Sequence, residues 1–591
     1  MASNRDDNYW LRKQRLNRRG FLKASGAAGL GAGAFALVGC GDDDDEPTPT
    51  ATATATGTAT ATATGTATAT ASPTEVAKTG GTLRIMTSSD NKRGFDPMHP
   101  AAWSNFEGDR NRAVFNNLLQ IKADGTTKPD ELEIVGDLIS KWEQPDPQTV
   151  RLTIADGAKW QNKGAVAGRA VTAQDVKFSI ERMQASQFAY KNNFAAISTV
   201  EAVDEKTVRL KLGSNDADLI AQLASRMLFV IAPEVGVAKA DAPGGKDYTD
   251  QATHIGSGPW ILENYTADAG WKFVKNPDYF KKGLPRPDRL EIQVHRDAAA
   301  QDAAFRSKAV DLIGHAFTRP TFDNALEYEK LGAKRIVGLE VAEQIGFDTT
   351  FNIETPPLND LRVRQALQLA WDGVAYQQSQ LRSEEAKKSV VQRVGIIGKA
   401  FGEWYLPPDR MKPAVAELYK YNLARAKQLI KDAGAEGMEV PYFVNSCCAT
   451  PERVQGVIGV LEQSGLKFKM NLQEHAVNVS TTQLNQFQGA ALVAPSPGPI
   501  INGRLGLYLK IGNTNPFGVK EDPTLVAMIR KQWGELDRAA RIKMVHEIQE
   551  YIAEQVYSLS LWDMPINVVY WPNVHNVSGN KDRHYEQAWI G

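Results

Sequence analysis

A Thr-Ala repeat divides this chain of 591 residues into a short N-terminal part and a long C-terminal part. The repeat follows five consecutive acidic residues, Asp42 to Glu46, and runs to about Pro73 with no aromatic residue and no apolar period. Such a segment buries too little apolar surface to offset the entropy lost on ordering. We therefore expect residues 40–78 to form a disordered tether, so that any compact fold must lie within residues 79–591.

The residues before the tether have the pattern of an export signal. Seven basic and two acidic residues precede Cys40, and an apolar run extends from Ala24 to Val38. That run is shorter than the roughly 20 residues of a membrane-spanning helix and matches the apolar region of a signal peptide. Residues 1–39 are therefore predicted to be a signal peptide that is removed from the mature chain.

Two motifs refine this prediction. Asn17–Lys23 contains the pair Arg18 and Arg19 and resembles the twin-arginine export signal, from which it departs only at its first residue. Leu37–Cys40 resembles a bacterial lipobox, whose cysteine thiol receives a diacylglycerol. The alternative is a plain signal peptide with an incidental cysteine. Because both motifs occur together, we predict lipid attachment at Cys40, which anchors the chain to the extracytoplasmic face of the cell membrane, in the periplasm or at the cell surface.

Composition limits what the long part of the chain can do. The formal net charge is −1 and the folded part is near neutral, so we expect no nucleic acid partner. The eight histidines and three cysteines form no His-x-x-x-His or Cys-x-x-Cys motif, so we predict no metal site and no other cofactor. A disulfide between the neighbours Cys447 and Cys448 would be strained, and two thiols are the favoured interpretation.

Local patterns predict several elements. Thr172–Asp175 has the form of a helix start with a variant capping box, and Val176, Ile180 and Met183 follow at the spacing of a buried helical face. Gly256–Pro259 is typical of a tight turn before a strand. Helical and strand patterns alternate irregularly along the chain, which predicts α/β lobes with mixed sheets.

Eight short blocks occur in the long part of the chain. They are Gly80–Ile85, Trp142–Trp160, Val171–Ser179, Ile255–Trp260, Lys275–Phe280, Leu361–Leu367, Asn422–Ile430 and Asp432–Gly434. In this order they resemble the extracellular solute-binding proteins of family 5, the peptide, nickel and opine receptors of ABC import transporters. The resemblance covers nearly all of residues 79–591.

The resemblance implies an α/β fold of two lobes, a periplasmic-binding-protein-like clamp of the large class II type with an extra inserted subdomain. Residues 79–345 together with 541–591 would form lobe I, the insertion would lie at about 113–244, and residues 346–540 would form lobe II. A small solute would bind between the lobes, which close by hinge rotation, and would pass to the permease subunits of an ABC importer. We expect a monomer.

Recognition pockets favour large flat side chains together with a few polar groups. The candidate ligand contacts are Trp103, Glu343, Gln344, Trp404, Ser496 and Trp562. For any one of the tryptophans, core packing is the alternative interpretation.

The resemblance also bears on the ligand. In peptide-binding members of the family, the segment corresponding to Ala491–Pro499 carries an aspartate that pairs with the peptide amine, whereas this chain has no acid there. We therefore favour a neutral or hydroxyl-rich solute such as an oligosaccharide over short peptides. Opines and metal chelates stay open, and Glu343 is the alternative partner for an amine.

No sequence feature argues for an enzyme. An exported lipoprotein enzyme, such as a carbohydrate hydrolase, is nevertheless the alternative function, and a surface adhesion or scaffold protein is the third. Saturable binding without turnover separates a receptor from an enzyme, and a cavity between two lobes argues against a scaffold.

Overall fold

The computed structural model describes residues 77–591 with internal gaps. The stretches outside the described residues are 1–76, 89–94, 99–104, 127–132, 186–192, 225–227, 236–250, 315–317, 319, 339–346, 389, 391–392, 446–450, 475–476, 479–480, 483–485, 494–499, 510–521, 563–565 and 580–584. By its contacts the chain separates into two units, Met1–Ala77 and Lys78–Gly591. The predicted signal peptide, Cys40, all but the last two residues of the tether, and the pair Cys447–Cys448 therefore lie outside the described residues.

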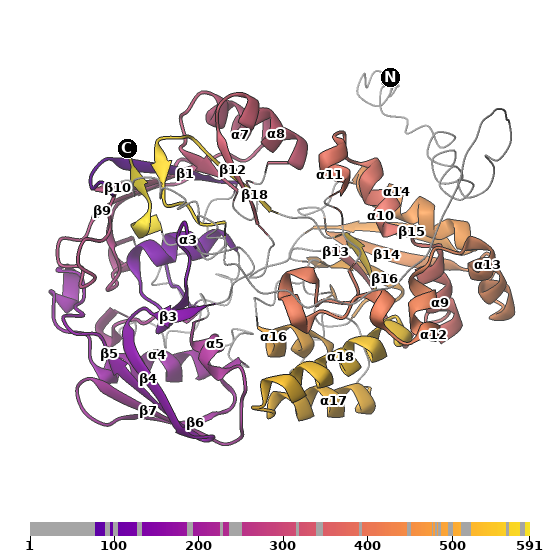
Figure 1. Ribbon diagram of the computed structural model, residues 1–591, viewed down its shortest axis with the longest axis horizontal. Helices are drawn as coiled ribbons and strands as arrows, with labels where there is room; N and C mark the ends of the chain where they lie inside the picture. Colours follow the sequence, from indigo (N-terminus) through magenta and orange to yellow (C-terminus); the bar gives the residue numbers. More distant parts are fainter. Residues whose placement is uncertain are drawn as a thin grey trace, which may run out of the picture. The chain divides into compact units, whose positions relative to one another are not determined.

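A mixed seven-stranded sheet takes strands from both ends of the second unit (Figure 1). In spatial order the strands are β12 (Lys334–Gly338), β18 (Ile566–Tyr570), β11 (Leu312–Ile313), β1 (Thr82–Thr87), β10 (Arg289–Val294), β9 (Gly270–Lys275) and β8 (Trp260–Thr266). Strand β1 runs parallel to β10 and β11. Helices α7 (Ala298–Arg306) and α8 (Phe322–Lys330) share a small core with this sheet, in which Phe305 stacks on Trp571 with ring centroids 4.9 Å apart.

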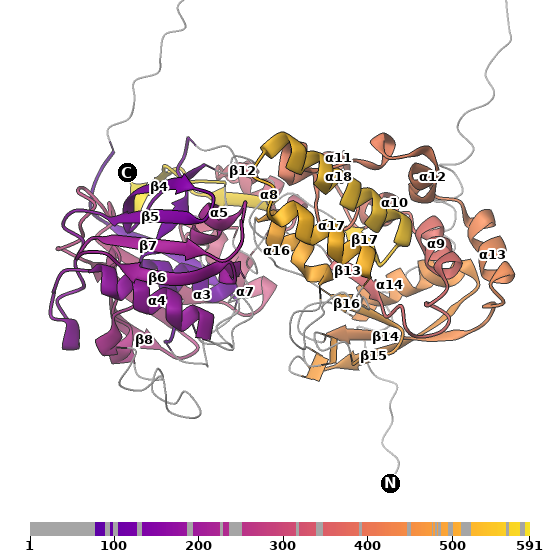
Figure 2. The same cartoon turned by 90° about the horizontal axis from the view of Figure 1, so that it is seen from below.

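An antiparallel four-stranded sheet lies inside the predicted insertion (Figure 2). Its order is β4 (Ile139–Asp146), β5 (Thr149–Ile154), β7 (Thr207–Leu212) and β6 (Ile197–Ala202). Helix α4 (Ala173–Ala185) buries Val176, Ile180 and Met183 in the core beneath the sheet, as its spacing predicts. Around these elements lie α3 (Asn105–Val114), β2 (Leu119–Ile121), β3 (Ile134–Gly136) and α5 (Leu219–Leu223).

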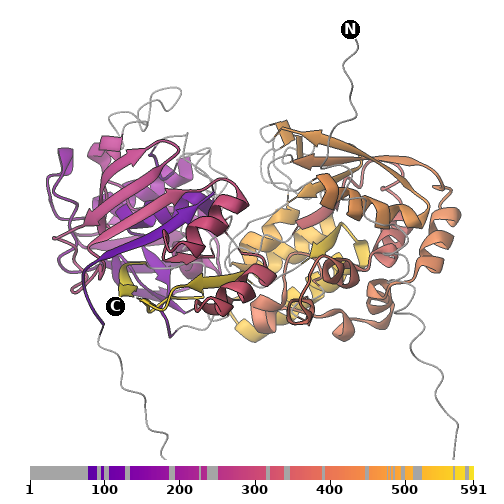
Figure 3. The ribbon, with the colours of Figure 1, turned by 90° about the horizontal axis from the view of Figure 1, so that it is seen from above.

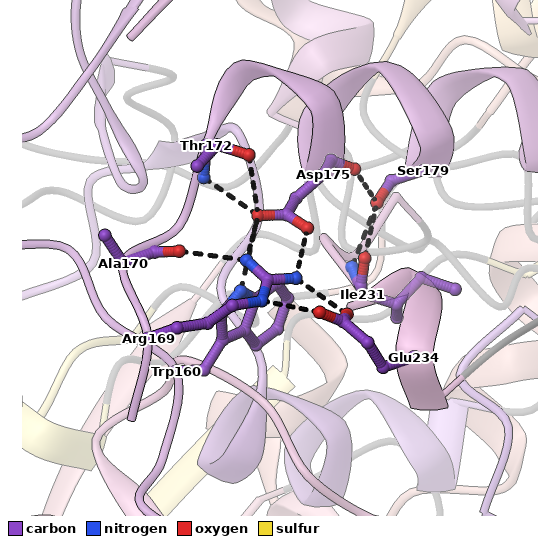
Figure 4. Close-up of polar contacts among 8 residues, drawn as sticks. All are labelled: Trp160, Arg169, Ala170, Thr172, Asp175, Ser179, Ile231 and Glu234. Carbon is purple, nitrogen blue, oxygen red and sulfur yellow. Dashed lines mark hydrogen bonds and ion pairs between the residues drawn. The ribbon is translucent and has the colours of Figure 1, made fainter. Parts of the chain in front are cut away.

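An ion-pair cluster fixes the start of α4 (Figure 4). The Arg169 guanidinium donates to Asp175 at 2.7 and 2.8 Å and to Glu234 at 2.6 and 2.7 Å, and these two carboxylates raise its pKa. Asp175 also accepts the Thr172 backbone N–H at 2.8 Å, which confirms the predicted capping box. These charges therefore hold the loop before α4 against the segment after α5.

The blocks around β8 and β9 have structural roles. A Cβ added at Gly256 would lie 2.0 Å from the Val114 carbonyl oxygen, and one added at Gly258 would lie 2.5 Å from the Val114 carbonyl carbon. Ser257 donates to the Asn116 side chain at 2.9 Å, and Asn116 donates to Asp137 at 2.8 Å. The glycines are required because the chain passes directly against the backbone at the end of α3.

A second, five-stranded sheet belongs to the later part of the chain (Figure 3). Its order is β15 (Lys467–Gln473), β14 (Glu439–Asn445), β16 (Ala490–Val493), β13 (Phe347–Phe351) and β17 (Ser558–Trp562). The helices in this part are α9 (Leu361–Ala370), α10 (Gly373–Ser379), α11 (Glu384–Lys388), α12 (Pro413–Ala416), α13 (Leu423–Asp432), α14 (Pro451–Leu461), α16 (Ile501–Leu505), α17 (Pro523–Trp533) and α18 (Arg538–Gln555). A short pair, β19 (Val574–His575) and β20 (Trp589–Ile590), closes the chain.

The sheets show where the chain passes from one lobe to the other. The first passage lies between β12 and β13, and the predicted boundary at residues 345 and 346 falls within it. The return lies between β17 and β18, because β17 still pairs with β13. The predicted return at residue 541 instead falls inside α18, so the sheet topology moves that boundary to a point after Trp562.

In the part of the chain that the structure describes, we find no helix with the length and apolar character needed to cross a bilayer.

Candidate ligand site

The strand ends that flank the two passages between the sheets lie close together. Trp562 at the end of β17 pairs with Phe347 at the start of β13, and Ile566 at the start of β18 pairs with Gly338 at the end of β12. Only three residues separate Trp562 from Ile566, so their Cα atoms are at most about 15 Å apart. The ends of four strands, two from each sheet, therefore gather in one region, which we call the crossover region.

Three of the six candidate ligand residues belong to the crossover region by their place in the chain, and a fourth follows β16, which pairs with β13 there. Glu343 and Gln344 fall between β12 and β13, and Ser496 follows β16 by three residues; all three are outside the described residues. Trp562 is the last residue of β17, where the structure describes the strand but not the side chain. Trp103 is outside the described residues, and the contacts of all five with a ligand stay predictions.

Trp404, the sixth candidate, lies elsewhere. It ends the 3-10 helix Lys399–Trp404, and its ring faces the guanidinium groups of Arg538 and Arg541 at 5.1 and 5.3 Å. Its carbonyl oxygen accepts a hydrogen bond from the Gln549 side chain at 2.7 Å. The structure thus packs Trp404 on α18, and its contact with a ligand stays a prediction.

A buried ion pair lies directly beneath the crossover region. Asp348, one residue after the start of β13, is fully buried, and its carboxylate lies 2.6 Å from Nη2 of Arg393, whose side chain is 2% exposed. Arg393 also donates to the Gly395 carbonyl at 2.6 Å. Because Asp348 is already neutralised by a guanidinium, its carboxylate is not available to bind a ligand amine.

The charges of Asp348 and Arg393 also act on the buried side chain of Tyr508. Burial, followed by the negative charge of Asp348, raises the pKa of its hydroxyl above the ordinary value, so the side chain is a neutral phenol. Across the sheet, the Thr349 and Tyr442 hydroxyls share a hydrogen bond in the core. Asp348 and Arg393 thus balance each other, and the hydroxyls of Tyr508, Thr349 and Tyr442 add no charge beside them.

Within the described ranges, no group of three or more His, Cys, Asp or Glu side chains is placed to hold a metal ion.

Comparison with known proteins gives the family. A model of bacterial extracellular solute-binding proteins, family 5, described as its middle part, matches residues 133–494. The chain belongs to this family. Its members are solute-binding proteins rather than enzymes, as the sequence predicts, and the predicted family is confirmed.

Relatives of this family 5 protein carry several ligand names. A protein of Brucella ovis named as an ABC transporter peptide-binding protein is 31% identical over 318 residues, which cover 52% of this chain and 53% of the relative. The heme-binding protein A of Haemophilus influenzae is 25% identical over 392 residues, which cover 63% of this chain and 65% of the relative. The chain thus spans about half to two thirds of the length of the relatives it matches.

Solved structures confirm the fold of the family 5 protein. A periplasmic binding protein of Helicobacter pylori in complex with the peptide STSA superposes with a TM-score of 0.71 at 19% identity, covering 87% of this chain and 98% of that one. A binding protein of A. tumefaciens R10 in complex with agropinic acid superposes with a TM-score of 0.68 at 20% identity, covering 86% and 99%. The predicted α/β, two-lobed periplasmic-binding-protein fold is therefore confirmed.

Proposed function

We propose that this family 5 protein captures a small solute between its two lobes, outside the cytoplasm, and delivers it to an ABC importer. The crossover region carries the proposal. The strand ends that flank both connections between the two sheets gather in one place, and such a place can serve as a hinge about which lobes rotate to close over a ligand. Three of the candidate ligand residues, Glu343, Gln344 and Trp562, lie on or beside these connections in the chain, and Ser496 follows β16, whose Val493 pairs with Asp348 of β13.

The proposed ligand is a small polar organic molecule whose binding does not depend on a free amine. The relatives are named for peptides and heme, and one similar structure holds agropinic acid, which supports a soluble organic ligand. The segment Ala491–Pro499 has no acid, and Asp348 beneath the crossover region is paired with Arg393. A buried ammonium group without a partner is costly, so an amine would gain little here.

A ligand screen tests the function. We expect one class among oligosaccharides, peptides, opines and metal chelates to raise the thermal midpoint, because a ligand that binds only the native state stabilises it. Calorimetry should then give one site per chain, with no product formed. If peptides bind, N-acetylation should change the Kd by less than about tenfold, which is 1.4 kcal/mol.

Two outcomes count against this account. Steady turnover of the ligand would favour an exported enzyme over a binding protein. A peptide whose binding disappears on N-acetylation would refute the proposed ligand chemistry while leaving the binding function intact.

We further propose that the mature protein is held at the membrane by lipid. Arg18 and Arg19 would direct export, removal of residues 1–39 would make Cys40 the first residue, and acyl chains on Cys40 would be the anchor. Residues 40–78 would then act as a flexible tether between the membrane and the folded unit.

A further inference from the structure

Two separate hydrophobic cores of the folded unit are joined by a polar contact. Leu219 and Leu223 of α5 belong to the core that includes the four-stranded sheet, whereas Leu505 of α16, Ile529 of α17 and Val545 of α18 belong to a second core. The turn before α5 lies against these three helices, all of which are labelled in Figures 1 and 2. We call the contact the α5 bridge; its residues are Asp216, Asp218, Asn502, Gln532 and Arg541.

Asp218 is the centre of the α5 bridge. Its carboxylate accepts from Nη1 of Arg541 at 2.6 Å and from the backbone N–H of Asn502 at 2.7 Å. The side chains of Arg541 and Asp218 are only 5% and 10% exposed. Both oxygens of this carboxylate are therefore bound by the second core, across a sequence separation of about 300 residues.

The other members complete the network. Arg541 also donates to Gln532 at 3.0 Å and to the Asn502 side chain at 2.9 Å. Asn502 in turn donates to Asp216 at 3.1 Å, and the Ala217 backbone N–H donates to the Trp533 carbonyl at 3.0 Å. The ring of Trp404 covers the Arg541 guanidinium at 5.3 Å and shields it from water.

The chemistry of this contact suits an interface that separates. A buried ion pair loses much of its attraction to the cost of desolvation, and each charge regains its hydration when the partners part. An apolar contact of the same size would instead expose its surface to water and oppose separation. The polar α5 bridge can therefore hold two lobes together and still release them.

We propose that the α5 bridge is a latch between the inserted subdomain and lobe II, formed when the lobes are together and broken when they separate. The latch rests on the proposed function, because it presumes that the lobes move apart to admit a solute. None of its five residues is among the candidate ligand contacts, so it would set how often the lobes are closed without touching the ligand. Trp404 acts in it as a positioning residue for Arg541.

Hydrogen exchange of the ligand-free full chain tests the latch. In the Asp218→Asn variant, backbone amides on the two faces of the bridge should exchange at least about tenfold faster than in the wild type, because local opening exposes both faces. The first face is 215–223, and the second face is 500–509 together with 530–541. Strands β10 and β13 should keep their wild-type exchange. The measurement needs no ligand, so it can detect the latch even if the protein binds none of the solutes in the screen. Failure of the latch and failure of the proposed function are therefore distinguishable.

A matched control removes a similar ion pair within one core. Asp96 pairs with Arg182 at 2.7 Å, with side chains 8% and 16% exposed, and Asp96→Asn should leave exchange at 500–541 unchanged. The proposal fails if Asp218→Asn leaves both faces as protected as in the wild type. It also fails if β10 and β13 loosen equally, because the bridge would then be a fixed part of the folded core.

A second variant gives an independent readout by pH. Burial first, and then the neighbouring charge of Asp218, raise the pKa of Asp216 to about 6, while Arg541 from α18 opposes the shift. The neutral donors Asn502 and Gln222 and the Asp218 backbone N–H complete its surroundings. In the separated state the Asp216 carboxyl would return toward its ordinary value of 3.8.

This difference in the pKa of Asp216 determines how the strength of the latch changes with pH. The latched form binds the Asp216 proton more tightly, so the latch is strongest at low pH and weakens as pH rises through about 6. The hydrogen-exchange protection of both faces, corrected for intrinsic exchange rates, should be greater at about pH 5 than at about pH 7.5. The Asp216→Asn variant should show no such difference between the two pH values. Equal pH dependence in wild type and Asp216→Asn would contradict this assignment.

Discussion

Replacing Cys40 with serine is expected to abolish the incorporation of a labelled fatty acid and to release the exported protein from the membrane. The serine hydroxyl does not replace the thiol that the lipobox motif presents for thioether formation. Each buried CH₂ of an acyl chain contributes about 0.8 kcal/mol, so the loss of two or three chains removes the whole anchor. Membrane fractionation together with metabolic labelling measures both effects.

The matched control for this prediction is Cys447→Ser, which makes the same chemical change in the folded part of the chain. It should keep both the label and the membrane association of the wild type. If Cys40→Ser still fractionates with membranes and carries the label, the protein is anchored by other means.

Replacing Arg393 with alanine should produce the largest loss of folding stability among single changes beneath the crossover region. The variant leaves the Asp348 carboxylate buried without its partner, and breaking a buried pair in this way costs about 3–5 kcal/mol. The double variant Asp348→Asn/Arg393→Ala removes the unpaired charge and should lose less. Urea denaturation followed by circular dichroism gives the midpoints of all three proteins.

An exposed pair provides the comparison for Arg393. Arg362 lies 2.6 Å from Asp360, with side chains 51% and 30% exposed, and such pairs contribute about 0–1 kcal/mol. Arg362→Ala should therefore shift the midpoint only slightly. Equal losses for Arg362→Ala and Arg393→Ala would show that the buried pair has no special weight.

The local elements of this fold could be predicted from sequence because their causes are local. The face Val176, Ile180 and Met183 and the capping box at Thr172 and Asp175 are set within one helix, and both are confirmed. The Gly256–Pro259 turn could be predicted, but its reason could not. The glycines are needed because of Val114, about 140 residues away in the chain.

The features that depend on long-range pairing escaped prediction. The return to lobe I was placed at residue 541 because no pattern indicates that β17 joins β13 after α18 has ended. Asp348 and Arg393 are 45 positions apart, and neither lies in a motif that would mark them as partners. The same holds for Asp218 and Arg541, whose contact joins two hydrophobic cores and spans 323 positions of the chain.

The candidate ligand residues differ in how far their surroundings could be predicted from the sequence. Glu343, Gln344 and Trp562 lie within or at the start of the connections that the strand ends of the crossover region bracket, whereas Ser496 follows β16, and the ligand contacts of all four stay predictions. The sequence makes Trp404 a candidate through its large flat side chain, whereas the structure packs that ring on Arg541. An aromatic residue in a loop can serve a charged partner as well as a ligand, and sequence alone does not separate the two.

Small-angle scattering of the purified protein, with and without the ligand found by the screen, tests the central claim most directly. Contacts from both lobes to one solute exist together only when the lobes are closed, so binding shifts the population toward a more compact form. The account predicts a smaller radius of gyration at saturating ligand than in its absence. Superimposable scattering profiles in the two conditions, with binding confirmed by calorimetry, would contradict capture by closure of two lobes.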